Sequence, residues 1–508
     1  MSDTDGPANL ALALEALATE GGWSEKAAFL VGDRVFTHAE VHRGGARTAT
    51  LLAALGVSPG DRVLLVVPDG IEFVWVFLAA VRLGAVVIPV NPRLTPDDHR
   101  QMLHDASPRV VVADAERVGR FAAGATAVLA VESLEESLRG AALHPGVEVG
   151  PGAPAYAQFT SGTTGAPKAA VHRHCDPTVY FEAFARPAVG LSRGDVVLSV
   201  SKMFFAYGLG NSVFFTLQAG CQAVLHPGAP KPADIAALVR RHGVTVLFSV
   251  PTFFAHLVTD GTGEGLSSLR AAVCAGEPLK AALAERVRSF LGCPILDGLG
   301  STEVGQTFVS NTLQEQCDGT IGRVLPPYEV AVRDDERRDL PPGEVGTLWV
   351  RGPTVLVEYL GRREATTAVK DGDWLFTGDR ALVRPDGFVC HQGRVDDIEI
   401  VGGINVGPYE IEDVLARHPA VTEVAVAAVR DELGASRLEA FVVVVPGGGP
   451  ADGVAEHLVD LARRNLAPHK VPRAVRFVDE LPRTPTGKLR RFVLRSGQWP
   501  SAPGNRSV

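Results

Sequence analysis

The stretch of residues 159–168, FTSGTTGAPK, is the most informative part of this sequence. It follows an apolar run at 155–159 that predicts a strand, and residues 161–168 hold three hydroxyl side chains, two glycines and one lysine. Glycines let backbone N–H groups approach phosphate oxygens, hydroxyls donate hydrogen bonds, and the ammonium group supplies positive charge. The stretch therefore predicts a loop that binds a polyphosphate. It differs from the G-x-x-x-x-G-K-[ST] nucleotide loop because Pro167 precedes the lysine and Ala169 follows it.

Apolar runs alternate with helical patterns on both sides of this loop. The predicted strands cover residues 62–67, 85–90, 109–113, 195–200, 244–250 and 271–275. Strands this apolar are expected where helices cover both faces of a parallel sheet. Between them, residues 233–243 predict a helix with Asp234 as a cap of its first turn and Gly243 just past its end. The alternation predicts doubly wound α/β layers, which bind ligands at the carboxyl ends of their strands.

The pattern changes twice after this region. Shorter strands with Gly/Pro turns, at 329–333, 346–351 and 388–390, predict a small β subdomain. After Arg394 come a helix at 408–418, strands at 421–429 and 438–445, and a helix at 454–465. We therefore expect a large N-terminal domain over residues 1–395, built of α/β subdomains plus the small β subdomain, and a small α+β C-terminal domain over residues 396–508.

Composition excludes several classes of protein. The 508 residues are 46% hydrophobic and 21% charged, and the net charge is −9, which argues for a folded core and against a nucleic-acid partner. The acidic start is unlike a signal peptide, and Arg82 and Gly84 interrupt the apolar stretch 73–90, so no membrane span is expected. The six cysteines form no CxxC or Cys/His spacing, as in a reduced cytoplasmic protein without a structural metal. The oligomeric state stays open, with a homodimer as one expectation.

The loop at 159–168 resembles the phosphate-binding loop of the adenylate-forming superfamily: acyl- and aryl-CoA synthetases, adenylation domains of peptide synthetases, and beetle luciferases. Further segments resemble that family in the expected order, at 297–303 (DGLGSTE), 376–379 (FTGD), 393–397 (GRVDD), 399–405 (EIVGGIN) and 482–491 (PRTPTGKLRR). The resemblance implies an AMP-forming acid–thiol ligase that uses ATP, Mg²⁺ and coenzyme A. Ala169 departs from the family, which usually has glycine there, and a local effect on loop mobility is expected.

The resemblance also implies roles for single residues at the nucleotide. Thr302 would donate to the α-phosphate, Glu303 would hold Mg²⁺, and Asp379 would accept hydrogen bonds from the ribose hydroxyls, with Arg394 as its partner. Residues 275–278 resemble the stretch that lines the adenine face. The expected ATP- or AMP-binding residues are Thr160, Ser161, Gly162, Thr163, Thr164, Gly165, Lys168, Gly276, Glu277, Pro278, Asp297, Gly298, Thr302, Asp379 and Arg394.

Three positions near the C-terminus complete the implied mechanism. Lys488 would contact the acid's carboxylate and the phosphate during adenylation, so Lys488, Thr302 and Glu303 are the expected catalytic residues. Asp396 aligns with the hinge about which the small domain rotates. That rotation would withdraw the lysine and bring Gly402 and Gly403 to the site, where glycines leave room for the pantetheine arm of coenzyme A.

The acid is expected to carry a ring. Residues 202–211 (KMFFAYGLGN) resemble benzoate-type CoA ligases, in which the positions of Ala206, Tyr207, Gly298 and Gly300 flank the aryl ring. Phe204 and Phe205 are expected to belong to the core. The sequence departs from those enzymes at 304–307 (VGQT), where Gly305 and Gln306 favour a wider and more polar pocket. An aryl or bulky cyclic carboxylic acid is therefore a broader expectation than benzoate. The stretch 357–360 (VEYL) receives no role.

Several alternatives share the nucleotide motifs. They are a stand-alone adenylation enzyme that loads a carrier protein, a medium- or long-chain acyl-CoA synthetase, and a luciferase-like oxygenase. A non-catalytic nucleotide sensor belongs to a different class, and the joint presence of Lys168, Glu303, Asp379 and Lys488 argues against it. The sequence leaves the acid and the pathway open.

Overall fold

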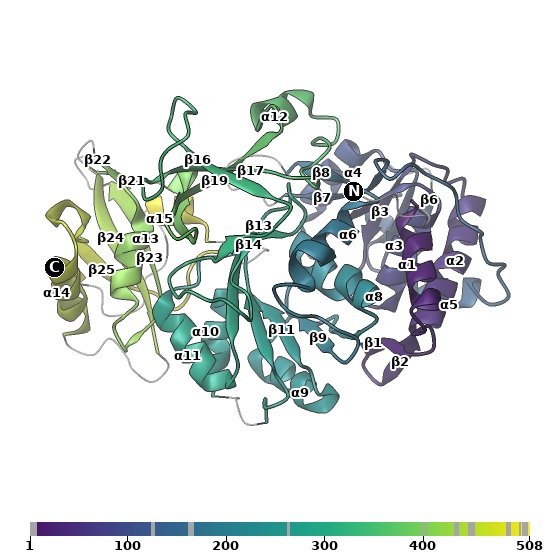
Figure 1. Ribbon diagram of the computed structural model, residues 1–508, viewed down its shortest axis with the longest axis horizontal. Coiled ribbons are helices and arrows are strands. Elements are labelled where there is room, and N and C mark those ends of the chain that lie inside the picture. The colour runs from purple at the N-terminus through teal and green to yellow at the C-terminus, as the bar shows by residue number, and fades with distance from the viewer. Residues whose placement is uncertain are drawn as a thin grey trace.

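The computed structural model is an α/β protein with a large N-terminal domain and a smaller α+β C-terminal domain (Figure 1). It describes residues 8–122, 127–160, 167–261, 265–397, 399–401, 404–430, 436–445, 453–483, 489–496, 499 and 506–507. The yellow-green C-terminal strands lie at one end of the molecule in this view, and the purple N-terminal helices lie at the other.

A nine-stranded sheet forms one half of the large domain. Its order is β15-β14-β13-β12-β11-β9-β10-β1-β2. These strands are β1 (Ala27–Val31), β2 (Arg34–Thr37), β9 (Val196–Ser199), β10 (Gln222–Leu225), β11 (Val246–Ser249), β12 (Ala271–Cys274), β13 (Ile295–Gly300), β14 (Thr307–Ser310) and β15 (Arg323–Val324). The strands from β13 to β1 pair in parallel, and β2, β14 and β15 are antiparallel additions at the edges. Helices α9 (Pro232–His242), α10 (Pro251–Thr259) and α11 (Ala281–Leu291) contribute to the core beside β11 and β12.

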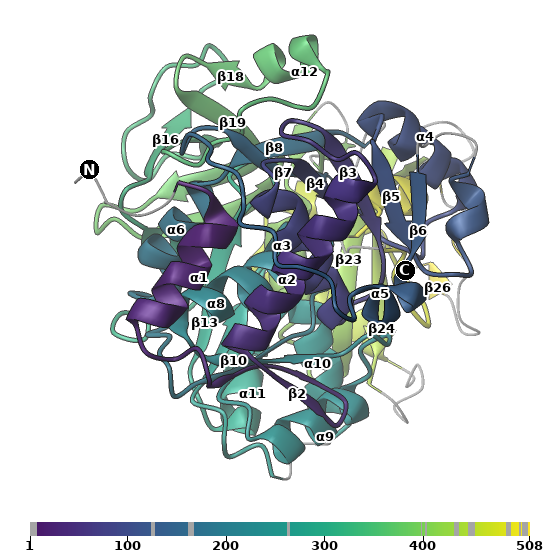
Figure 2. The same ribbon diagram turned by 90° about the vertical axis from the view of Figure 1, so that its right-hand side faces the viewer.

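A six-stranded sheet forms the other half, in the order β6-β5-β3-β4-β7-β8. Its strands are β3 (Arg62–Val66), β4 (Val86–Pro89), β5 (Val110–Ala113), β6 (Ala127–Ala130), β7 (Pro154–Phe159) and β8 (Ala169–Arg173), with only β8 antiparallel to its neighbour. Figure 2 shows helices α1 (Leu10–Glu20), α2 (His38–Ala54) and α3 (Ile71–Arg82) side by side. The remaining α-helices of the large domain are α4 (Pro96–Ala106), α5 (Leu134–Ser137), α6 (Asp176–Tyr180), α7 (Ala206–Leu209), α8 (Phe215–Ala219) and α12 (Arg363–Ala368), with π-helical turns at Phe181–Ala185 and Gly210–Phe214.

The apolar stretch 73–90 is interior structure, as expected. It forms most of α3, a turn and β4, and every α3 residue except Glu72 is buried. A helix that is apolar on all sides needs protein around it, which α1, α2 and the sheet provide. Within the described residues, no helix combines the length and the apolar character needed to cross a bilayer.

Two smaller units follow. The β subdomain pairs β16 (Glu329–Arg333), β17 (Gly346–Arg351), β18 (Lys370–Asp371), β19 (Trp374–Val383) and β20 (Val389–Arg394). The C-terminal domain contains β21 (Glu399–Val401), β22 (Ile404–Val406), α13 (Pro408–Leu415), β23 (Val421–Arg430), β24 (Ser436–Val444), α14 (Val454–Asn465), β25 (Ala474–Phe477), α15 (Arg491–Arg495) and β26 (Arg506–Ser507). It has an apolar core of its own between α13, α14 and the β23–β25 strands.

The predicted elements exist, with shifted ends. Each expected strand of the two α/β sheets is present within two residues of its expected ends. Helix α9 ends at Gly243 in the left-handed conformation, with φ of 60°, as its position predicts. Asp234 lies in the first turn of α9 but is not its cap, because Lys231 occupies the N-cap and no side chain caps the helix. The expected helix at 408–418 ends earlier, at Leu415.

His174 makes the stability of the large domain depend on pH. It is 1% exposed, its Nδ1 accepts a hydrogen bond from the Leu10 backbone N–H at 3.1 Å, and Nε2 has no partner in the described part of the chain. Burial lowers the pKa of His174 from 6.5 to about 4. Unfolded chains therefore bind a proton that folded chains do not, so this stabilisation is complete above pH 6.5 and is lost as pH falls toward 4.

We expect His174→Asn to lose less stability in acid than the wild type. The asparagine amide keeps an acceptor near the Nδ1 position but cannot take up the proton. By pH 4 the difference should reach about 3 kcal/mol. Urea unfolding of both proteins between pH 7 and pH 4 measures it, and equal dependence of the unfolding free energy on pH would contradict the assignment.

Candidate active site

A cavity of about 700 Å³ lies where the two large sheets and the C-terminal domain meet. The large domain lines it with residues at or just after the carboxyl ends of four parallel strands: Thr160 after β7, Pro251 and Thr252 after β11, Gly276–Pro278 after β12, and Gly298–Glu303 at the end of β13. The C-terminal domain contributes Glu423, Arg483, Leu489 and Arg491, among others. The position agrees with the expectation for a doubly wound sheet.

The described ends of the phosphate loop both face this cavity. The Thr160 backbone N–H donates to the Lys168 carbonyl at 2.8 Å, which closes the base of the β7–β8 hairpin. The Lys168 ammonium lies 5.1 Å from the centre of the Tyr359 ring, a cation–π contact. Ser161, Gly162, Thr163, Thr164 and Gly165 lie outside the described residues, so their contacts with a phosphate stay predictions.

Thr302 and Glu303 lie on the turn between β13 and β14, and both line the cavity. The Tyr359 hydroxyl donates to Glu303 Oε1 at 2.8 Å. Burial, together with the neighbouring carboxylate, raises the pKa of Tyr359 far above its usual range, so the hydroxyl keeps its proton and stays a donor. Tyr359 belongs to the stretch 357–360, which received no role from the sequence.

Glu303 fits a magnesium ion that arrives with a nucleotide. Among the described residues, no cluster of three or more His, Cys, Asp or Glu side chains could hold a metal ion. Magnesium commonly takes one or two carboxylates and completes its shell with phosphate oxygens and water. A single oriented carboxylate at the cavity wall matches that donor set.

Gly298 and Gly300 also line the cavity, and the β13–β14 pairing explains why they are glycines. A Cβ at Gly298 would lie 2.9 Å from the Val309 carbonyl oxygen, and one at Gly300 would lie 2.8 Å from the Gln306 carbonyl oxygen. Real Cβ atoms do not approach backbone so closely. Any larger residue would therefore displace β14.

Asp379 contacts two basic side chains at the cavity wall. Arg394 NH1 lies 3.4 Å from Asp379 Oδ1, which brings together the pair expected from the resemblance. His391 Nε2 lies 3.2 Å from the same oxygen, and His391 Nδ1 accepts from the Gly393 backbone N–H at 3.3 Å. Because Nδ1 is an acceptor, Nε2 carries the proton and donates to the carboxylate. The sequence did not indicate His391.

Glu277 connects the expected adenine face to the C-terminal domain. Arg483 donates to Glu277 Oε1 at 2.8 Å and to Glu423 Oε2 at 2.6 Å. Thr252 Oγ1 donates to the other Glu277 oxygen at 2.6 Å. Burial raises the pKa of Glu277, and the Arg483 guanidinium opposes that shift. This ion pair holds the two domains together beside the cavity.

Of the residues expected at the acid, Gly298 and Gly300 line the cavity, whereas Ala206, Tyr207 and Gln306 are not among the described residues that line it. Asp297, expected at the nucleotide, does not line it either. The Tyr207 hydroxyl donates to the Val273 carbonyl at 3.2 Å. Gln306 is 3% exposed; its Oε1 accepts from the Thr307 N–H at 3.0 Å, and its Nε2 has no partner in the described part of the chain. A Cβ on Gly210 would overlap with that Nε2, so Gln306 packs against the π-helical turn.

The expectation that Gly305 widens an acid pocket was wrong. Its φ is 87°, a conformation that L side chains rarely adopt, and a Cβ there would overlap with the Tyr180 hydroxyl. The missing side chain makes room for Tyr180 and not for a substrate. Phe204 is buried and Phe205 packs against the same core, as expected.

Gly402, Gly403 and Lys488 lie outside the described residues, so their roles stay predictions. Asp396, the predicted hinge, lines the cavity. Its carboxylate lies 3.4 Å from Arg394 Nε, and its backbone carbonyl accepts from Arg495 at 3.1 Å. Arg483 was within the predicted 482–491 segment, where its charge was a usable signal. Tyr359 and His391 had no comparable signal, because tertiary pairing brings them to the site.

Two family models match this chain. The model described as AMP-binding enzyme matches residues 18–360, and the model of the AMP-binding enzyme C-terminal domain matches residues 410–488. The chain belongs to the AMP-binding enzyme family. This AMP-binding enzyme is 44% identical over 498 residues to p-hydroxybenzoic acid–AMP ligase FadD22 of Mycobacterium tuberculosis, covering 97% of this chain and 70% of that protein. It is 39% identical to benzoate–CoA ligase of Thauera aromatica, covering 88% of each chain.

Solved structures agree with the fold of this AMP-binding enzyme over nearly its whole length. The anthranilate CoA ligase AuaEII, in complex with anthranoyl-AMP, superposes with a TM-score of 0.93 at 31% identity and covers 98% of both chains. A benzoate CoA ligase of Burkholderia xenovorans superposes with a TM-score of 0.89 at 35% identity, over 96% of this chain and 100% of the other.

Tyr359→Phe should lower the affinity for the Mg²⁺ that binds together with ATP. The variant loses the donor that orients Glu303, and loss of such a partner typically costs about tenfold or more in metal affinity. We expect the Mg²⁺ concentration for half-maximal ATP binding, measured by calorimetry, to rise about tenfold. In a Glu303→Gln background the same change should add little, and fully additive losses would contradict this role of Tyr359.

Proposed function

We propose that this AMP-binding enzyme is an ATP-dependent aryl acid:CoA ligase. One observation carries the proposal: the described members of three separated motifs, Thr160 and Lys168, Thr302 and Glu303, and Asp379 and Arg394, line one cavity. Similarity to proteins named benzoate–CoA ligase and anthranilate CoA ligase supports the choice of an aryl acid and of coenzyme A.

The chemistry takes two steps. A carboxylate is a poor electrophile, so one of its oxygens first attacks the α-phosphorus of ATP; that P–O bond forms as the bond to pyrophosphate breaks. The coenzyme A sulfur then bonds to the acyl carbon, the thiol loses its proton, and AMP leaves. In the first step Lys168 and Thr302 would donate to phosphate oxygens, where negative charge gathers, and the cavity would hold the reacting groups in line.

The proposal also assigns roles to the residues expected at the ribose, the adenine and Mg²⁺. Asp379, held by His391 and Arg394, would accept hydrogen bonds from the ribose hydroxyls, and Gly276–Pro278 would line the adenine. Mg²⁺ at Glu303 would supply charge that offsets the phosphate oxygens. The six cysteines are free thiols, which supports a cytoplasmic location.

We infer that the aryl ring carries a polar substituent. Two relatives support this choice, since p-hydroxybenzoic acid and anthranilate are both benzoic acids with a polar ring substituent.

A second candidate function has the same adenylation step and differs in the molecule that accepts the acyl group. The relative at 44% identity is named an acid–AMP ligase, and this chain spans 70% of it. That name describes formation of the acyl-adenylate and no coenzyme A, which keeps a carrier protein as the alternative acceptor.

Acid-dependent pyrophosphate release tests the function. Wild-type enzyme with ATP and Mg²⁺ is offered 4-hydroxybenzoate, anthranilate, benzoate, cyclohexanecarboxylate and octanoate. We expect release with the substituted aryl acids to exceed that with benzoate, and release with octanoate to be near background. Mass spectrometry then shows whether free coenzyme A or a carrier protein takes the acyl group. No release with any acid would overturn the proposal, and thioester on the carrier alone would establish the second function.

Lys488→Ala should slow adenylation by about 10²–10³-fold, because it removes a cationic donor from a reacting oxygen, as loss of an oxyanion donor does. Pre-steady-state pyrophosphate release measures the step. A variant that adenylates at the wild-type rate would exclude Lys488 from the first half-reaction.

We also propose that the domain boundary lies between residues 395 and 396, with Asp396 as the hinge. Asp396→Pro fixes φ at this residue and should hinder rotation. We expect the variant to form the acyl-adenylate at nearly the wild-type rate but to lose most thioester formation, where Gly402 and Gly403 are proposed to act. Equal losses in both half-reactions would count against the hinge.

A further inference from the structure

Four successive backbone carbonyls of the turn that carries Thr302 and Glu303, those of residues 301–304, each accept a hydrogen bond. The four acceptor–donor pairs are Ser301 O with Gly305 N at 2.9 Å, Thr302 O with His172 Nε2 at 2.7 Å, Glu303 O with Leu356 N at 2.8 Å, and Val304 O with Thr354 Oγ1 at 2.8 Å. The second of these comes from a histidine ring on β8, in the other large sheet.

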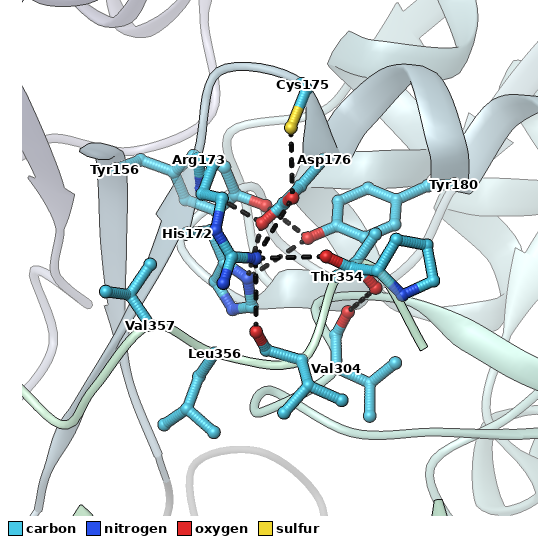
Figure 3. Close-up of polar contacts among 12 residues, drawn as sticks. Tyr156, His172, Arg173, Cys175, Asp176, Tyr180, Val304, Thr354, Leu356 and Val357 are labelled. Atoms are coloured by element: carbon cyan, nitrogen blue, oxygen red, sulfur yellow. Dashed lines mark hydrogen bonds and ion pairs between the residues drawn. The ribbon is translucent and has the colours of Figure 1, made fainter. Parts of the chain in front are cut away.

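The His172 ring is held on all sides. It is fully buried, and it stacks on Tyr156 with ring centres 5.2 Å apart. Nδ1 lies 3.2 Å from the Tyr180 hydroxyl and 3.4 Å from Asp176 Oδ2 (Figure 3). A carbonyl oxygen can only accept, so Nε2 carries a proton and donates to Thr302.

The groups behind the ring are themselves anchored. Asp176 is fully buried, and its Oδ2 accepts from the Arg173 backbone N–H at 2.9 Å. The Tyr180 hydroxyl lies 3.0 Å from that of Tyr156 (Figure 3). The same Tyr180 hydroxyl occupies the space that a side chain at Gly305 would need. The cluster of Tyr156, His172, Asp176 and Tyr180 therefore contacts the turn twice, through His172 at Thr302 and through Tyr180 at Gly305.

His172 also lies on the strand that leaves the phosphate loop. Lys168 precedes β8 directly, and His172 is four residues further along, about 13 Å at the rise of an extended strand. Two segments that face the cavity, the end of the phosphate loop and the Thr302–Glu303 turn, are thus joined by one short strand and one hydrogen bond.

We propose that His172 is a positioning residue for adenylation, which rests on the function proposed above. Its hydrogen bond sets the orientation of the peptide between Thr302 and Glu303, and with it the directions of the Thr302 hydroxyl and the Glu303 carboxylate. Without the donor, the Thr302 carbonyl loses its hydrogen-bond partner and the peptide turns toward another one. A shift of about 1 Å in a reacting group is enough to slow a reaction about 10²-fold.

The test compares two substitutions at this position. His172→Phe keeps an aromatic ring but removes the donor, and we expect kcat for acid-dependent pyrophosphate release to fall about 10²-fold, with KM for the acid nearly unchanged. His172→Gln places an amide N–H near the Nε2 position and should return kcat to within about tenfold of wild type. Thermal unfolding of each variant is measured in parallel.

His99 offers a matched control. It is 1% exposed, and its Nε2 lies 3.0 Å from the Asn91 carbonyl oxygen. The centre of its ring lies 5.4 Å from that of Phe121. His99 does not line the cavity. His99→Phe removes the same kind of bond and should lower stability comparably while kcat stays within about threefold of wild type.

Two results would overturn the inference: equal losses of kcat in His172→Phe and His99→Phe, or no recovery in His172→Gln at comparable stability. ATP binding in the presence of Mg²⁺ gives a readout that needs no acid, and His172→Phe should weaken it about tenfold. If the wild type releases pyrophosphate with no acid, the proposed function fails, and ATP binding alone then decides for or against His172.

Discussion

A hydrogen bond from His172 Nε2 on β8 to the Thr302 carbonyl after β13 joins the two large sheets of this AMP-binding enzyme beside the cavity. The cavity forms because parallel strands from both sheets end at this junction, and loops that follow those strands face one another across it. Glycines allow close packing around the junction. The missing side chains of Gly298 and Gly300 let β14 pack against β13, and that of Gly305 leaves room for the Tyr180 hydroxyl. If this junction shifted, the wall that carries Thr302 and Glu303 would shift with it.

Three acidic side chains at the cavity each have a partner that donates a hydrogen bond. Asp379 faces Arg394 and His391, Glu277 faces Arg483, and Glu303 accepts from Tyr359. Buried carboxylates are costly unless they are paired or hydrogen-bonded, so these contacts fix the direction of each acid group before a ligand arrives. The Glu277–Arg483 pair crosses between domains, so a rotation of the small domain must break it. Its position next to the proposed adenine face links nucleotide contacts to domain orientation.

Much of the fold was predictable because it depends on local pattern. The apolar strands from β3 to β13 and the helix before Gly243 are visible as periodicity and as a left-handed C-cap, and both signals act within a few residues. The motif residues Lys168, Thr302, Glu303, Asp379 and Arg394 were found by resemblance, and all line the cavity. Tyr359, His391 and His172 were not found, since each contacts a partner in a distant or separate segment of the chain. The interpretation of Gly305 failed because a side chain there is excluded by the Tyr180 hydroxyl, which is more than a hundred residues upstream.

The sequence by itself indicated candidate residues for the chemistry and the order in which the strands and helices follow one another. The chemistry of a glycine, hydroxyl or charged residue is evident from the residue type alone, and hydrophobic periodicity is a property of a short stretch of sequence. Only the tertiary structure decided which of these groups share a cavity and what holds them there. Hydrogen bonds such as His172 to Thr302, 130 residues apart, depend on how two sheets pack, and packing geometry is not encoded in any short window of sequence.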